Sequence, residues 1–158
     1  MCSRCYARMK ARAPFSRRGR HAYCLRPSSD SQLIETALTL ARRAVDLDKG
    51  HQNLPWDEMV LGMAEYRHGN YRAADQALTT AEDLGKGNRF VRDPARFFHA
   101  MSLFHQGNES GGRQMFNEVE TRMKPLPADE HQSLADGVGP DDLIVWLAYK
   151  EAKALLQH

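Results

Sequence analysis

The feature that most constrains the fold of this chain is a segment that recurs along it. Residues 62–71 read GMAEYRHGNY and residues 100–109 read AMSLFHQGNE, so the Gly-Asn pairs that begin at Gly69 and Gly107 are 38 residues apart. Ala37 and Ala74 occupy similar places 37 residues apart. A period in the high thirties accommodates two helices, and it is typical of stacked helical hairpins.

The spacing of apolar residues predicts helices throughout the chain from Asp30 onward. Apolar side chains recur every three or four residues, which is the pattern of an amphipathic helix, over about 31–48, 56–68, 71–84, 94–106, 109–123 and 141–156. Ser29 or Asp30 is placed to cap the first helix. No segment alternates with a period of two, so we expect an all-α fold.

The recurring segment resembles the tetratricopeptide repeat, which places Leu-Gly in its first helix and small residues at fixed intervals in its second. The residues that carry the resemblance are Leu61, Gly62, Ala64, Tyr66, Gly69, Asn70, Tyr71, Ala74, Leu78 and Ala81. A weaker match covers 94–123, and 31–48 resembles the second helix of an earlier repeat. The resemblance implies stacked helical hairpins that form a short right-handed α-solenoid with a C-terminal capping helix.

Several residues depart from the pattern of this family: Trp56 lies five residues before Leu61 where the family usually has three, and Lys86 replaces the closing proline. Glu65 stands where an aromatic residue is common, and Arg96 and His99 fall at positions that are usually apolar. Gly62 and Ala74 keep the pattern, and small residues at these positions let two helix backbones approach closely.

Charge divides the chain into a basic leader and a mildly acidic body. Residues 1–30 carry eight basic side chains and one acidic side chain, whereas residues 31–158 carry 14 basic and 19 acidic ones. We therefore expect a disordered leader over 1–30, repeats over 31–124, a loop over 125–140 and a capping helix over 141–158. Binding of nucleic acid by the body is not expected, because it requires clustered positive charge. A run of about 18 apolar residues would indicate a membrane helix, and the sequence contains none. We therefore expect a cytoplasmic protein without a membrane partner.

Few residues suggest a catalytic or metal-binding site. Cys2, Cys5, His21 and Cys24 offer thiolate and imidazole ligands of the kind that zinc prefers, which leaves a zinc-dependent nucleic-acid binder as an alternative for the leader. An Arg-rich targeting presequence is another. The stretch between the two ligand pairs is rich in Arg and contains one glycine, Gly19, and two aromatic residues, Tyr6 and Phe15, and a disordered leader is favoured. We expect no catalytic residue, metal or cofactor in the body.

The functional prediction is a surface that binds a protein or peptide partner. The family resemblance implies that the first helix of each repeat lines a concave groove, and here that apolar and aromatic face consists of Trp56, Met59, Met63, Tyr66, Phe97, Met101 and Phe104. Methionine and aromatic side chains suit adaptable recognition of apolar partners. The alternative is that these side chains form the core between helices. The oligomeric state is left open.

Two further expectations concern a narrower family resemblance and the last helix. Residues 66–71, 98–103 and 146–152 are together similar to repeat arrays that end bacterial serine/threonine kinases and related signalling proteins. The chain has no glycine-rich phosphate loop and no His-Arg-Asp motif; the second hypothesis is therefore a detached regulatory repeat region, with a kinase or other signalling protein as partner. Trp146 is expected to anchor the last helix on the 109–123 helix.

Overall fold

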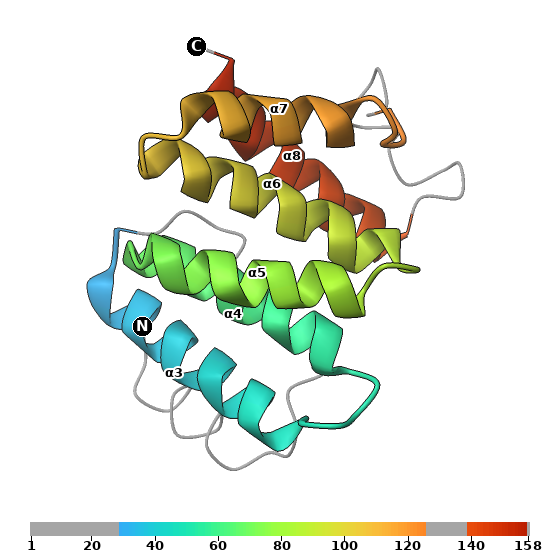
Figure 1. Cartoon of the computed structure of the whole chain (residues 1–158). Coiled ribbons are helices and arrows are strands. Elements are labelled where there is room, and N and C mark those ends of the chain that lie inside the picture. The colour runs from blue at the N-terminus through green and yellow to red at the C-terminus, as the bar shows by residue number, and fades with distance from the viewer. Residues whose placement is uncertain (1–28, 126–138, 158) are drawn as a thin grey trace.

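The computed structural model describes residues 29–125 and 139–157, and this part of the chain is all-helical, with no strand. The helices follow one another through a stack that begins at α3 and ends at α7 and α8 (Figure 1). Their bounds are α3 Ser31–Leu47, α4 Leu54–His68, α5 Tyr71–Leu84, α6 Arg89–His105, α7 Glu109–Glu120 and α8 Pro140–Leu156. The all-α expectation is confirmed. The predicted leader over 1–30 lies almost entirely outside the described residues.

The helix boundaries follow local hydrogen bonding that the sequence signals. The Asp30 carboxylate caps α3 by accepting from the backbone N–H of Gln32 at 3.0 Å and of Leu33 at 3.2 Å. Gly69 and Gly107, which follow α4 and α6, both have φ of +84°. A residue with a Cβ adopts that left-handed conformation only with strain. The two Gly-Asn breaks therefore end their helices as predicted.

One predicted boundary is wrong. We expected the fourth helix to begin near Pro94, but α6 begins at Arg89 and contains Pro94 in its interior. Asn88 explains the earlier start, because its side chain accepts a hydrogen bond from the backbone N–H of Phe90 at 3.1 Å. Val91, in the first turn, is fully buried and holds this turn against the body of the protein.

Packing follows the order of the chain with one asymmetry. α4 contacts α3, α5 and α6, and α6 contacts α4, α5, α7 and α8. Within the described residues no contact joins α3 to α5 or α5 to α7. Contacts thus run from α4 to α6 and from α6 to α8. Among the described helices, α3, α5 and α7 do not contact one another, because α4 and α6 lie between them.

Glycines permit the closest approaches between paired helices. A Cβ added at Gly62 of α4 would lie 2.4 Å from Cγ of Leu78 in α5, and one at Gly112 of α7 would lie 2.6 Å from the carbonyl oxygen of Ala100 in α6. Gly62 and Ala100 hold the same place in the two copies of the repeated segment. The same position of the repeated segment therefore lies at both close approaches, opposite Leu78 in the first and opposite Gly112 in the second.

The core lies along the contacts of α4 and α6 with their neighbours. Its fully buried side chains include Leu38, Met59, Met63, Leu78, Phe97, Phe98, Met101, Phe116 and Leu156. None of the described helices is both long enough and apolar enough to cross a membrane.

Candidate partner-binding surface

The residues predicted to line a groove lie on α4 and α6, but most are covered. Met59, Met63, Tyr66, Phe97 and Met101 are buried, as the inter-helix core interpretation predicts. Trp56 and Phe104 are half-buried. As the chain stands, only these last two present part of their surface to solvent.

α8 covers part of this face. Tyr149 packs with its ring centroid 5.7 Å from that of Phe97, and it stacks on Phe116 of α7, with the ring centroids also 5.7 Å apart. The Tyr149 hydroxyl donates to Glu120 Oε1 at 2.7 Å. These contacts fix the aromatic side chain of α8 between α6 and α7.

The placement of α8 corrects one expectation. Trp146 is buried, as predicted, and its Nε1 donates to the carbonyl oxygen of Lys124 at 3.2 Å. α8 nevertheless packs chiefly on α6 and less on α7, whereas we expected the 109–123 helix to be its main support. α8 therefore lies across the inner helix of the last pair instead of continuing the stack on α7.

An ion pair joins α8 to α4. Both terminal nitrogens of the Arg67 guanidinium, Nη1 and Nη2, donate to the carboxylate of Glu151, and the Nη2 to Oε2 distance is 2.5 Å. The Arg67 side chain is 11% exposed and that of Glu151 is 23% exposed. The Arg67 guanidinium also lies 5.2 Å from the ring centroid of Phe98 and 5.6 Å from that of Tyr66. Aromatic faces and a carboxylate thus surround this cation, an arrangement that favours a bidentate Arg pair.

Sequence reasoning missed Arg67 and Glu151 as a pair. The two residues are 84 positions apart, and although they lie in the segments 66–71 and 146–152 that carry the kinase-linked resemblance, no spacing pairs them. The only local signal is the position of Arg67 beside Tyr66 in the repeated segment.

Tyr66 occupies a buried polar junction next to this ion pair. Its hydroxyl donates to Met101 Sδ at 3.8 Å and lies 3.2 Å from His105 Nε2. Burial raises the pKa of the Tyr66 phenol, and the negative charge of Glu151 raises it further. The phenol therefore stays protonated and serves as a hydrogen-bond donor rather than as a base.

The two ionisable residues that depart from the repeat pattern in α6 lie in a polar seam, which we define by Glu82 of α5, Arg96 and His99 of α6, and Glu118 of α7. His99 Nδ1 lies 3.0 Å from Glu82 Oε1, and Arg96 Nη2 donates to Glu118 Oε2 at 2.6 Å. Arg96 Nε is also 3.8 Å from Glu82. The seam therefore links α5 and α7, which do not contact each other, through the side chains of α6.

Another departure, Glu65, is a buried carboxylate with partners on both oxygens. Arg42 of α3 donates to Oε1 through Nε at 3.0 Å and Nη2 at 2.8 Å, and Asn70 Nδ2 donates to Oε2 at 2.8 Å. One side chain thus ties α3, α4 and the turn before α5 together, a role that an aromatic ring does not fulfil.

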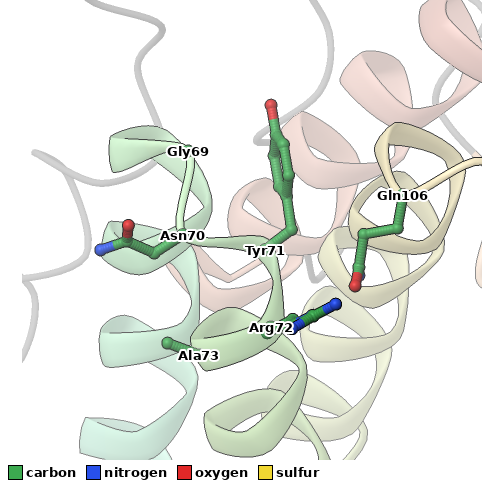
Figure 2. Close-up of a pocket in the computed structure, with 6 residues that line it drawn as sticks. All are labelled: Gly69, Asn70, Tyr71, Arg72, Ala73 and Gln106. Atoms are coloured by element: carbon green, nitrogen blue, oxygen red, sulfur yellow. The ribbon is translucent and has the colours of Figure 1, made fainter.

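A shallow depression lies at the start of α5 (Figure 2). Its lining consists of Gly69, Asn70, Tyr71, Arg72 and Ala73, together with Gln106 from the end of α6. Gln106 is occupied by a hydrogen bond to Asp75 at 2.7 Å. The lining contains one cation and neither a carboxylate nor a histidine, so it offers no acid–base pair for catalysis.

Metal ligation finds no support in the part of the chain that the structure describes, where no group of three His, Cys, Asp or Glu side chains is arranged to hold a metal ion. Cys2, Cys5, His21 and Cys24 lie outside the described residues, so the zinc alternative for the leader stays a hypothesis. The kinase-linked alternative rests on the sequence resemblance alone.

Comparisons with models of known protein families, with curated proteins and with solved structures find no match to this chain.

Proposed function

We propose that this chain is a non-enzymatic interaction module that binds an amphipathic helical segment of a partner protein on the face formed by α4 and α6. One observation carries the proposal: α8 already lies on α6 in this manner, with an aromatic anchor at Tyr149 and an ion pair to α4. The resemblance of the sequence to the tetratricopeptide repeat also supports it, since that resemblance implies that the first helix of each hairpin, here α4 and α6, lines the binding groove.

The chemistry of α8 defines the partner that this face suits. Arg67, held between the rings of Tyr66 and Phe98, favours a carboxylate on the bound helix. Phe97 and Phe116 favour an aromatic side chain one or two residues from that carboxylate, as Tyr149 is from Glu151. The binding mode is an amphipathic helix seated on an apolar face, and Phe97, which Tyr149 covers, becomes available where a partner helix replaces α8.

A peptide with the α8 sequence tests this proposal. The receptor is the full chain carrying Glu151→Gln, which weakens its own α8 contact and leaves Trp146 in place. The probe is a fluorescently labelled peptide of residues 139–157, and binding is measured by fluorescence anisotropy. We expect saturable binding, because the peptide supplies the carboxylate that the receptor lacks.

The ion pair provides the specificity control. A hydrogen-bonded contact to a charged group contributes about 1.5–3 kcal/mol, so Glu151→Gln in the peptide should weaken binding about 10-fold to 100-fold. Arg67→Gln in the receptor should abolish the difference between the two peptides, whereas Arg113→Gln, at an exposed arginine of α7, should preserve it. Absence of binding, or equal binding of both peptides to the receptor with Arg67 intact, would refute the proposal.

A further inference from the structure

A second ion pair holds α8 near its start. Arg89, the first residue of α6, donates from Nη2 to Asp142 Oδ1 at 2.7 Å. The Asp142 side chain is 6% exposed and that of Arg89 is 41% exposed, so the carboxylate is covered whereas solvent reaches the cation. The other Asp142 oxygen accepts from the backbone N–H of Gly139 at 2.9 Å, as in a capping box. One carboxylate therefore both begins α8 and attaches it to α6.

Asp142 and Glu151 lie on opposite flanks of the buried face of α8. They are nine residues apart, which corresponds to about two and a half turns and about 13.5 Å along a helix axis. Ala152, which is fully buried, projects between the two flanks. Arg89 of α6 therefore holds one flank near the start of α8, and Arg67 of α4 holds the other flank farther along it.

Contacts with α6 also set the register of α8. Asp142 pairs with Arg89, and Tyr149 packs on Phe97 with the ring centroids 5.7 Å apart. The first two residues are 53 positions apart in the chain and the second two are 52 apart, so α8 passes over α6 in the direction in which α6 itself runs. A helix displaced by one turn from this register would lose both contacts.

We propose that Arg89 is a second specificity-determining residue of the face formed by α4 and α6, and that the partner helix carries two carboxylates nine residues apart. This inference rests on the proposed function, because it assigns to the partner the contacts that α8 makes. The first carboxylate binds Arg89, an aromatic side chain seven residues later packs on Phe97, and the second carboxylate binds Arg67. A helix with only one of the carboxylates is held on one flank and binds less tightly.

The alternative is that Asp142 serves only to begin α8. A capping interaction stays within one helix and requires no arginine. Here the Arg89 guanidinium lies 4.3 Å from the ring centroid of Phe90, and this cation–π contact favours the place at which the carboxylate binds. The two roles differ in one measurable respect, because only the ion pair makes the effect of Asp142 depend on Arg89.

A peptide titration separates these roles. The receptor is the full chain carrying Asp142→Asn and Glu151→Gln, so that its own α8 supplies neither carboxylate, and labelled peptides of residues 139–157 are titrated by fluorescence anisotropy. Asp142→Asn in the peptide removes the charge and keeps an oxygen that can accept from Gly139. Since the pair is partly exposed, this change should weaken binding about 3-fold to 10-fold. It should have no effect in a receptor that also carries Arg89→Gln, whereas Arg113→Gln, at an exposed arginine of α7, should preserve the difference.

A second peptide tests the spacing of the carboxylates. Glu151→Ala together with Ala154→Glu exchanges two residues of the peptide, so composition and net charge are unchanged. Ala154 is exposed in α8, and the moved carboxylate therefore faces away from Arg67. We expect this peptide to bind as weakly as the Glu151→Gln peptide, about 10-fold to 100-fold below the unmodified one.

Three outcomes overturn this inference: equal binding of the Asp142→Asn and unmodified peptides, an Asp142 effect that persists without Arg89, or full affinity of the exchanged peptide. Each leaves the proposed function in place if Glu151→Gln still weakens binding through Arg67. Absence of binding by the unmodified peptide overturns the proposed function and this inference together. Circular dichroism first checks the helix content of the receptor. If it falls, the chain with Asp142→Asn alone replaces it, because the coupling of Arg89 with the peptide is still measurable.

Discussion

The crossing of α6 and α7 depends on the missing side chain at Gly112. A Cβ at this position would lie 2.6 Å from the carbonyl oxygen of Ala100 and 3.4 Å from the backbone nitrogen of Phe104. Both are backbone atoms of α6, so no side-chain rotation relieves the clash. Gly112→Ala therefore requires α7 to move away from α6.

The magnitude follows from two opposing effects. Alanine is more favourable than glycine inside a helix by about 1 kcal/mol, which stabilises the variant. Overpacking typically costs about 1–3 kcal/mol, and a displaced α7 also loosens the contacts of Phe116 and Val119, both of which are buried. We expect a net loss of about 1–2 kcal/mol, opposite in sign to the effect of the same substitution at an exposed helical site.

Urea unfolding followed by far-ultraviolet circular dichroism measures this loss, and Gly111→Ala is the matched control. The Cβ added at Gly111 would meet only the side chain of Asn108, at 2.7 Å, which can rotate away at the expense of its 3.1 Å hydrogen bond to the Gly111 N–H. Loss of that bond and gain in helix propensity nearly offset each other, so the control should lie within about 0.5 kcal/mol of wild type. A Gly112→Ala protein as stable as wild type would show that the helices do not approach this closely.

Two further predictions concern α8 and the buried phenol. Trp146→Ala should cost about 3–5 kcal/mol of unfolding free energy, because the ring is buried and its Nε1 donates to the carbonyl oxygen of Lys124. Leu147→Ala, on the exposed side of α8, should change the unfolding free energy by less than about 0.5 kcal/mol. Equal effects of the two substitutions in urea unfolding would contradict the placement of α8. The raised pKa of Tyr66 means that the folded state holds the phenolic proton more tightly than the unfolded state, so stability is lost as pH rises through the unfolded value of about 10. Tyr66→Phe should lose less stability than wild type between about pH 9 and pH 11, as measured by urea unfolding at each pH, and an identical loss in both proteins would contradict the burial of this hydroxyl.

Local signals predicted most of the helices, and they failed where distant contacts decide. Gly69 and Gly107 mark helix ends because the left-handed backbone at each of them requires glycine. The start of α6 was misplaced because proline commonly opens a helix, whereas here the Asn88 cap and the burial of Val91 extend the helix before Pro94.

The candidate surface was harder to predict than the fold. A stripe of methionine and aromatic residues has the same spacing whether it faces a groove or a core, so Met63 and Phe97 fit both interpretations. What buries them is tertiary packing, and for Phe97 this includes Tyr149 of α8. An ion pair between Arg67 and Glu151 helps to hold α8 in place. No local sequence pattern predicts this pair, because the two residues are 84 positions apart.

The polar seam leads to a last prediction, which concerns the pairing of His99 with Glu82. His99 is 15% exposed at its side chain and bonded to Glu82, which is 21% exposed. Replacing one partner of a buried hydrogen bond leaves the other unsatisfied, whereas replacing both with apolar groups of similar size is nearly neutral. His99→Leu alone and Glu82→Leu alone should therefore each cost about 1–3 kcal/mol of unfolding free energy.

The double variant places apolar side chains at both positions, and Arg96 keeps its bond to Glu118 at 2.6 Å. It should be more stable than either single variant, with a coupling energy of about 1–2 kcal/mol in a double-mutant cycle measured by urea unfolding. Additive losses would mean that His99 and Glu82 are stabilised independently, through Asp75 at 3.8 Å from His99 and Arg96 at 3.8 Å from Glu82. A positive coupling would instead establish that the departure from the repeat pattern is a matched polar pair: each side chain is tolerated in the seam because the other is present.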